Sequence, residues 1–159
     1  MRLREPLTVD DIDWITEACQ DAEIRRWTLV PSPYTRDDAA YFVAHPEIER
    51  ATWVIESDLG PVGLVSIHHV NGEGVAEVGY WMAPWGRGAG HASAALEQVV
   101  RIATGDPELV ALTARIAEAN AASRRTAERA GFVESGRIEG GCHDADTAAD
   151  AIVYRRDLR

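Results

Sequence analysis

The feature that most constrains this chain is a glycine-rich turn between a predicted strand and a predicted helix. Residues 75–82 are rich in β-branched and aromatic side chains, the turn follows, and apolar residues at helical spacing begin with Ala92. Gly88 and Gly90 permit backbone conformations that other residues disfavour, and the first amides of a helix have no partner within it. The helix dipole also places positive charge there. The turn therefore predicts a site for an anion such as a diphosphate, to which Arg87 adds charge.

A glycine-rich turn alone is weak evidence, because two glycines also suit a tight turn that binds nothing. Two other phosphate-binding patterns are absent. No segment matches the Gly-x-x-x-x-Gly-Lys-Ser/Thr pattern of a P-loop. No first strand leads into a Gly-x-Gly-x-x-Gly turn with an acidic residue about 20 positions later, as in a Rossmann dinucleotide site. The function of the turn must be inferred from its surroundings.

Length and charge limit the classes of function. The 159 residues suit one domain over 1–159, which buries roughly two-thirds of its unfolded surface. A net charge of −10 argues against a nucleic-acid binder, which usually carries a basic patch, and favours cationic partners such as protonated amines. No apolar run approaches the roughly 20 residues of a membrane span, and the N-terminus lacks an apolar signal segment. We expect a cytoplasmic protein with no membrane or nucleic-acid partner.

Cysteine and histidine spacing gives no sign of a disulfide framework or a metal site. Cys19 and Cys142 lie far apart and form no Cys-x-x-Cys pair. His68 and His69 are adjacent, no His-Glu-x-x-His pattern occurs, and we interpret both as strand residues. The sequence predicts no metal, and neither cysteine lies in a motif typical of a covalent acyl-enzyme.

The spacing of apolar residues predicts strands alternating with helices. Two capping boxes, Thr8 with Asp11 and Thr35 with Asp38, open helices on either side of a proline-containing loop over 27–33, and the first helix runs to about residue 20. Strands are expected at 2–7, 51–57, 61–70, 75–82, 109–116, 132–140 and 151–158, with further helices at 92–103 and 121–130 and a polar loop at 140–149. This order predicts an α/β (α+β) fold with helices covering a mixed sheet.

Three segments resemble the GNAT superfamily of N-acetyltransferases. Residues 77–92, EVGYWMAPWGRGAGHA, resemble its motif A, with Arg87, Gly90 and Ala92 in the fixed places of Arg/Gln-x-x-Gly-x-Gly/Ala. Residues 120–123 (NAAS) and 129–132 (RAGF) are similar to the Asn-x-x-Ser and Gly-Phe signature of the RimJ/RimL-like branch, which acetylates ribosomal-protein N-termini. Residues 150–154 (DAIVY) resemble its final strand. The resemblance covers essentially the whole chain and implies a mostly antiparallel central sheet, flanked by helices and splayed at the fourth strand.

The resemblance implies acetyl-CoA as the donor substrate. Backbone amides of the turn would hold the diphosphate, and backbone groups at the end of the fourth strand would pair with the pantetheine arm. Asn120 would hydrogen-bond that arm, and Ser123 would lie near the thioester sulfur. The donor-binding residues implied in this way are Tyr80, Trp81, Met82, Arg87, Gly88, Ala89, Gly90, His91, Ala92, Asn120 and Ser123.

Direct attack of an amine on a thioester requires a neutral amine and a proton for the leaving thiolate. Glu77 is the candidate base because it precedes the splay, although its alternation with Ala76 and Val78 equally fits a solvated strand residue. Ser123 is the second candidate catalytic residue, and a hydroxyl that bonds its own helix backbone is the alternative. The predicted helix 121–130 carries no tyrosine, the acid of many relatives, so the proton donor stays open.

The acceptor is less defined than the donor. Trp27 and Tyr34 flank the loop where family members build the acceptor site, and His143 lies in the predicted 140–149 loop. These three are the predicted substrate-binding residues, with a core anchor for Trp27 and a solvated loop for His143 as alternatives. We expect an N-acetyltransferase whose acceptor is a protein N-terminal α-amine or a small-molecule amine. The alternative is a non-catalytic CoA-binding or interaction module. Acyl preference and oligomeric state stay open, a homodimer included.

Overall fold

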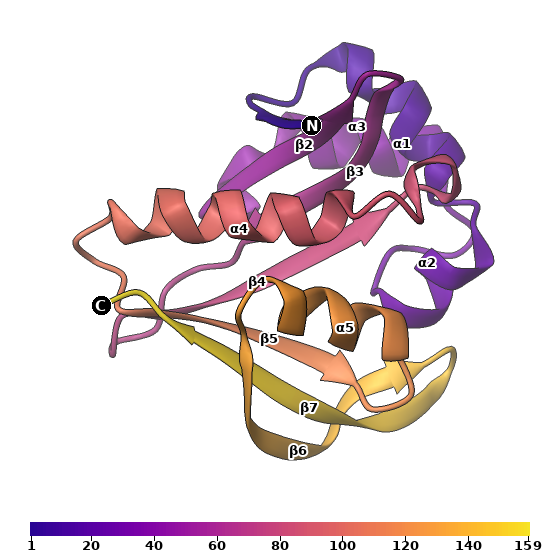
Figure 1. Cartoon of the computed structure of the whole chain (residues 1–159). Coiled ribbons are helices and arrows are strands. Elements are labelled where there is room, and N and C mark those ends of the chain that lie inside the picture. Colours follow the sequence, from indigo (N-terminus) through magenta and orange to yellow (C-terminus); the bar gives the residue numbers. More distant parts are fainter.

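A seven-stranded sheet forms the centre of the protein in the computed structural model, which describes all 159 residues (Figure 1). The strands are β1 (Arg2–Arg4), β2 (Ala51–Ser57), β3 (Gly60–Ile67), β4 (Val75–Met82), β5 (Ala111–Ala117), β6 (Val133–Asp144) and β7 (Thr147–Asp157). The helices are α1 (Ile12–Ala18), α2 (Ala22–Trp27), α3 (Arg36–Ala44), α4 (His91–Thr104) and α5 (Ala121–Arg129). Short 3-10 turns lie at Val9–Asp11, Pro46–Ile48 and Pro84–Gly86.

The strands lie in the order β1-β2-β3-β4-β5-β7-β6, and every neighbouring pair is antiparallel except β4 with β5. β3 stays paired with β4 as far as Met82, whereas β5 pairs with β4 only from Val75 to Glu77. Beyond Glu77 the two parallel strands diverge, as Figure 1 shows. The predicted mixed, mostly antiparallel sheet that is splayed at the fourth strand is confirmed.

Helices cover both faces of the sheet, because the side chains of a strand alternate between its faces. On one face, α4 and α5 pack against a core of 21 buried residues that includes Val65 and Leu96. On the other face, α1, α2 and α3 pack against a core of 10 buried residues that includes Ile15 and Leu64. Neighbours in one strand, such as Leu64 and Val65, therefore belong to different cores.

Most predicted elements are present, with boundaries that shift by a few residues. Both predicted capping boxes form, at Thr8 and at Thr35. The predicted 2–7 strand ends at Arg4, and the predicted 61–70 strand ends at Ile67. The histidine pair that we interpreted as strand residues consequently lies just beyond β3.

Helix α2 was not predicted from the sequence. Asp21 caps it by accepting a hydrogen bond from the Ile24 amide (3.1 Å). Of its six residues only Ile24 is buried, so apolar periodicity gave no signal there. The loop predicted over 27–33 therefore begins one residue later than predicted, at Thr28, and Trp27 is the last residue of a helix.

The predicted loop at 140–149 is wrong. β6 continues to Asp144 and β7 begins at Thr147, so only Ala145 and Asp146 connect the two strands. Gly, Ala and Asp residues fill this segment and are depleted in strands, but that preference is weak and the pairing with the partner strand overrides it. His143 therefore lies on a strand, opposite Ala148.

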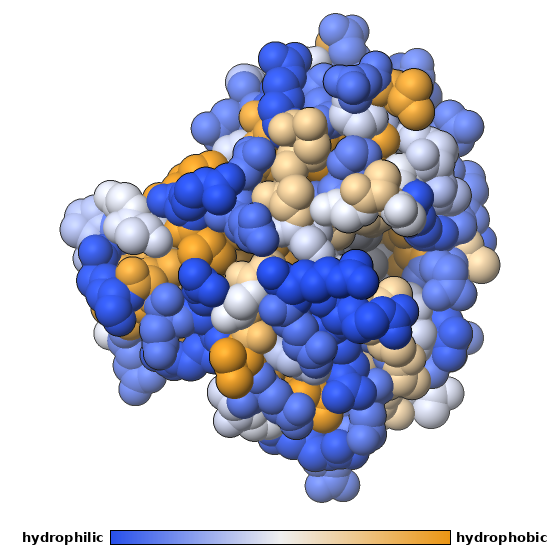
Figure 2. Space-filling model, in the orientation of Figure 1, coloured by the Kyte–Doolittle hydropathy of each residue, from blue (hydrophilic) through white to orange (hydrophobic).

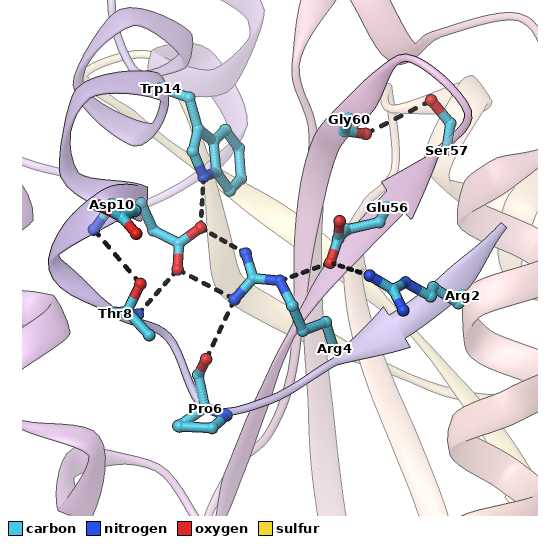
Figure 3. Close-up of polar contacts among 10 residues, drawn as sticks. Arg2, Arg4, Pro6, Thr8, Asp10, Trp14, Glu56, Ser57 and Gly60 are labelled. Carbon is cyan, nitrogen blue, oxygen red and sulfur yellow. Dashed lines mark hydrogen bonds and ion pairs between the residues drawn. The ribbon is translucent and has the colours of Figure 1, made fainter.

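A partly buried ion pair joins the N-terminal strand to the 3-10 turn that precedes α1 (Figure 3). Arg4 donates to both carboxylate oxygens of Asp11 (2.6 and 3.2 Å) and also binds Glu56 of β2. The Trp14 indole N–H donates to Asp11 as well (2.8 Å). Burial would raise the pKa of Asp11, but the hydrogen bonds from Arg4, the Thr8 amide and Trp14 together lower it below its usual value.

Hydrophilic residues cover most of the face shown in Figure 2, and the hydrophobic residues there form small separate patches. None of the helices combines the length and the apolar character that crossing a membrane requires.

Candidate active site

Two cavities adjoin the diverging ends of β4 and β5. We call the first, of about 450 Å³, the turn cavity because the glycine-rich turn lines it together with α2, the start of α4 and α5. The second, of about 620 Å³, is the hairpin cavity, lined by β3, β4, β5, β6 and the segment between α2 and α3. Six residues line both cavities: Trp27, Thr28, Tyr80, Trp81, Asn120 and Ser123.

The glycine-rich turn presents backbone rather than side chains to the turn cavity. Gly88 and Gly90 have φ angles of 83° and 76°, and a Cβ at either position would meet no atom within 4 Å. Gly90 is the N-cap of α4 and provides no side chain to cap it, and the first helical bond runs from Ala94 to Gly90. The amides of residues 91–93 consequently have no partner within the helix, as an anion site requires.

Positive charge gathers at the turn cavity although the chain as a whole is acidic. Its charged lining consists of three arginines (Arg87, Arg125 and Arg129) against a single carboxylate, Glu23. Arg87 also links the start of α2 to the end of β4, because its guanidinium donates to Asp21 (2.6 Å) and to the Met82 carbonyl (3.1 Å). This hydrogen bond from Arg87 lowers the pKa of Asp21, the residue that caps α2.

The splay leaves backbone groups of β4 unpaired. The His68 amide donates to the Glu77 carbonyl, and the Ala83 amide donates to the Val62 carbonyl (both 2.8 Å). The backbone N–H and C=O groups of odd-numbered residues in β4 therefore point toward β3. Because the backbone groups alternate along an antiparallel pair, those of Tyr80 and Met82 face the other side, where β5 has diverged. Apart from the Met82 carbonyl, which Arg87 binds, these groups are free to pair with an extended ligand.

Negative charge prevails in the hairpin cavity. Its charged lining comprises three carboxylates (Asp38, Glu49 and Glu77) against a single guanidinium, that of Arg115. Aromatic and apolar side chains form much of the remaining wall, among them Tyr34, Tyr41, Phe42 and Trp81. Such a lining suits a cationic group attached to an apolar body.

A tyrosine and a serine meet where the two cavities join. The Tyr80 hydroxyl lies 2.9 Å from Ser123 Oγ and 3.1 Å from the Ser123 carbonyl. Burial raises the pKa of Tyr80 to about 12, so the phenol keeps its proton at physiological pH. The sequence placed no tyrosine in the helix of Ser123, and the structure brings one from β4 instead.

Helix α5 is held in place by its N-cap and by the last strand. Asn120 accepts a hydrogen bond from the Ser123 amide (3.2 Å), which confirms the predicted cap. Tyr154 of β7 is fully buried, accepts from Arg124 (3.0 Å) and donates to Glu128 (3.1 Å). The position of Ser123 thus depends on contacts at both ends of a nine-residue helix.

Two pairs, each of a carboxylate with a basic side chain, lie in the hairpin cavity. Glu77 binds Arg115 of β5 (2.8 Å), so it is not the free solvated residue that alternation along the strand equally allowed. Glu49 binds Nδ1 of His68, whose ring lies over Gly79. Sequence reasoning missed this second pair, because only the alignment of β2 with β3, seen in the bond from Arg50 to the Ile67 carbonyl (2.9 Å), places Glu49 beside His68.

The structure brings nearly all of the predicted site residues together. The predicted donor-binding residues line the turn cavity except Ala89, which is part of the turn but not of the lining. Glu77, Tyr34 and His143 line the hairpin cavity, and Trp27 lines both. Asp144, next to His143, is bound by Arg26 of α2 (2.6 Å). No group of three or more metal-binding side chains is present.

Sequence comparison gives a family and a relative. The model of the acetyltransferase (GNAT) domain family matches residues 1–133. The Bacillus subtilis (strain 168) protein YdaF, which carries the name of a ribosomal N-acetyltransferase, is 31% identical over 93 residues, which make up 58% of this chain and 51% of that protein. The chain thus spans about half the length of the curated relative that it matches.

Solved structures share the fold across nearly the whole chain. RimL, a ribosomal L7/L12 α-N-protein acetyltransferase in complex with coenzyme A, has a TM-score of 0.87 at 17% identity, covering 98% of this chain and 92% of that one. RimJ of Mycobacterium smegmatis, in complex with CoA-disulfide, has a TM-score of 0.85 at 21% identity, covering 98% and 80%. These relatives agree with the RimJ/RimL-like resemblance of the motifs, and the chain belongs to the GNAT acetyltransferase family.

Proposed function

We propose that this protein transfers the acetyl group of acetyl-CoA to a primary amine, with both substrates bound at once. The observation that carries the proposal is the pair of cavities that meet at Tyr80 and Ser123, one lined by arginines and free backbone amides and the other by carboxylates. An anionic donor and a cationic acceptor would each enter the cavity of opposite charge. Their reacting ends would then meet at the shared residues.

The donor would occupy the turn cavity. Amides at the start of α4 would hold its diphosphate, and the free backbone groups of Tyr80 and Met82 would pair with the pantetheine arm. Arg125 and Arg129 would add positive charge near the phosphates. The complexes of RimL and RimJ with coenzyme compounds support this assignment, because both proteins share the fold.

Ser123 and Tyr80 would protonate the leaving thiolate. When the amine attacks, a C–N bond forms and the C–S bond breaks, so the sulfur needs a proton. The Ser123 hydroxyl would give it, and the Tyr80 hydroxyl at 2.9 Å would replace it. The contact of Tyr80 with Ser123 supports catalysis over the alternative of a non-catalytic module, because it supplies the tyrosine that the helix of Ser123 lacks.

The acceptor would enter the hairpin cavity as a protonated amine. An α-amino group has a pKa of about 7.7–8.0, so a single base suffices to deprotonate it. Glu77, the predicted base, lies in this cavity, as does the Glu49–His68 pair. Cys142 also lines it, but burial raises the pKa of its thiol, which favours direct attack by the amine over a covalent acyl-cysteine. The ribosomal name of YdaF and the ribosomal substrate of RimL favour a protein N-terminal amine, and a small-molecule amine is the second choice.

Thermal unfolding with and without acetyl-CoA tests donor binding. A ligand at 100 times its Kd adds about 2.7 kcal/mol to the free energy of unfolding, so we expect a clear upward shift in Tm. Free adenine at the same concentration is the control, because it lacks the diphosphate. Release of CoA in the presence of a panel of N-terminal peptides and small amines then tests transfer. An unchanged Tm at millimolar acetyl-CoA would rule out the proposal.

A further inference from the structure

We propose that His68, oriented by Glu49, is the group that takes the proton from the acceptor amine. The inference rests on the proposed function and adds a catalytic residue to it. Two carboxylates of the hairpin cavity are already engaged in other contacts. Asp38 holds the N-terminus of α3, where the Thr35 amide donates to it (2.8 Å). Glu77 would lose its ion pair with Arg115 on taking a proton.

His68 is the histidine of the cavity whose ring is hydrogen-bonded to a carboxylate, whereas His143 bonds the Ala145 carbonyl (3.2 Å). Glu49 binds Nδ1 of the ring. Because a carboxylate only accepts hydrogen bonds, the neutral ring must carry its proton on Nδ1, which leaves the lone pair on Nε2. No hydrogen bond occupies Nε2, and the side chain is 39% exposed, so a proton taken there can pass on to water.

The position of Nε2 is fixed by the strand beside it. His68 follows β3 directly, and its amide donates to the Glu77 carbonyl (2.8 Å), so its side chain projects on the same face as those of Glu77 and Trp81. A Cβ on Gly79 would lie 2.9 Å from Nε2. The imidazole therefore covers Gly79, the residue just before Tyr80, whose hydroxyl contacts Ser123.

The transfer then needs proton transfers at two groups, the acceptor amine and the leaving sulfur. The acceptor enters as an ammonium ion and gives one proton to His68 Nε2, and the resulting imidazolium, stabilised by the Glu49 carboxylate, passes that proton to water. The neutral amine then adds to the thioester carbon, and the tetrahedral adduct gives its second N–H proton to the neutral ring of His68. As the adduct collapses the C–S bond breaks, and the thiolate takes its proton from Ser123, which regains one through Tyr80.

The pH dependence would be set by His68 among several titratable neighbours. Glu49 faces its Nδ1 side, and Glu77 with Arg115 lies on the neighbouring strands of the same face. Asp38, Tyr34, Tyr41, Cys142 and His143 line the rest of the cavity. Because only a neutral ring accepts a proton, the proposal predicts that activity rises with pH.

The experiment compares kcat and KM across pH for the full chain with acetyl-CoA and the panel amine that gives the fastest CoA release. We expect His68→Gln to lower kcat at least 100-fold and to abolish the ascending limb of the pH profile. His69→Gln is the matched control, because His69 is adjacent but exposed and lies outside the cavity. Added imidazole should restore activity to His68→Ala and not to Ser123→Ala.

Two further variants separate a catalytic role from a structural one. Gly79→Ala keeps His68 but displaces its ring, and we expect the same loss in kcat with unchanged KM for acetyl-CoA. Glu49→Gln should give a smaller loss in kcat, because the imidazole base of His68 is still present but the carboxylate that orients it is gone. The proposal is overturned if His68→Gln keeps wild-type kcat and pH profile, or if Glu77→Gln alone removes the ascending limb. Failure of the proposed function would look different, since the wild type itself would then release no CoA.

Discussion

The turn cavity and the hairpin cavity share six lining residues but differ in what builds them. The turn cavity depends mainly on backbone: two glycines at positive φ, the free amides at the start of α4 and the unpaired edge of β4. The hairpin cavity depends on side chains from segments far apart in sequence, from Trp27 to His143. A backbone site selects a ligand feature common to a whole family, whereas a side-chain site can change with each member. The fold would thus conserve the donor and leave the acceptor free to vary.

The largest effect is expected at the junction, where both cavities depend on the same hydroxyls. Tyr80→Phe removes one hydroxyl and keeps the buried ring, and we expect kcat to fall about 100-fold or more while the KM of each substrate stays within a few-fold. Combining it with Ser123→Ala should add little, because groups that act as a unit are not additive. Tyr41→Phe, at an exposed tyrosine of the hairpin cavity, is the control. An additive double variant would contradict a joint role.

The second effect concerns a wall that the two cavities share. Trp81 packs against Trp14, with ring centroids 5.7 Å apart, and Trp14 is bound by the buried Asp11. Asp11→Asn weakens the hydrogen bonds to Arg4 and Trp14 and should lower the free energy of unfolding by about 2 kcal/mol. It should also raise both KM values together. Asp10→Asn, at the exposed neighbour, is the control, and an effect on one substrate alone would contradict the shared wall.

The same variant should change the acid side of the stability curve. The folded pKa of Asp11 is lower than its unfolded pKa, so the folded state binds fewer protons and the stability from this group is present at neutral pH. It is lost as pH falls below about 4, through the lowered pKa. Chemical denaturation from pH 7 downward should show the wild type and Asp11→Asn converging. A constant difference between them would contradict this assignment.

The third effect is confined to the turn cavity. Gly90→Ala places a Cβ at a φ of 76°, which costs roughly 1–2 kcal/mol for a residue other than glycine and fills the space where the diphosphate would lie. Calorimetry should show the Kd for acetyl-CoA rising at least tenfold, with the acceptor KM unchanged. Gly105→Ala is the control, because Gly105 ends the same helix at a φ of −79°. An equal rise in the Kd for acetyl-CoA in both variants would contradict a role of the turn in binding it.

The smallest effect is confined to the hairpin cavity. The half-exposed pair of Arg26 with Asp144 connects α2 to β6 beside this cavity, and solvent-exposed pairs of this kind contribute little to stability. Arg26→Gln should raise the acceptor KM a few-fold and leave acetyl-CoA binding alone. Arg36→Gln breaks a more exposed pair, with Asp13, and serves as the control. A change in acetyl-CoA affinity would contradict the assignment of donor and acceptor to separate cavities.

The contrast between a cavity built from contiguous backbone and one built from distant side chains also explains what could be predicted from the sequence. The turn and its helix are contiguous, so Arg87 to Ala92 and the Asn120 cap could be placed on the correct elements beforehand. Tyr80 was predicted to contribute only backbone, because no spacing rule shows that its hydroxyl meets Ser123, 43 residues later. Glu49 and His68 meet only through the register of β2 with β3. α2 and the extension of β6 and β7 through residues 141–149 were missed, because exposed short helices and runs of small residues carry almost no periodic signal.

Amide hydrogen exchange with and without acetyl-CoA tests the central claim most directly, because it needs no knowledge of the acceptor. The account predicts slower exchange at residues 88–93, at Tyr80 and Met82 and at the start of α5, with no change at residues 29–34 or 141–143 of the hairpin cavity. Protection of the hairpin segments in place of the turn, or no protection anywhere at saturating acetyl-CoA, would contradict it.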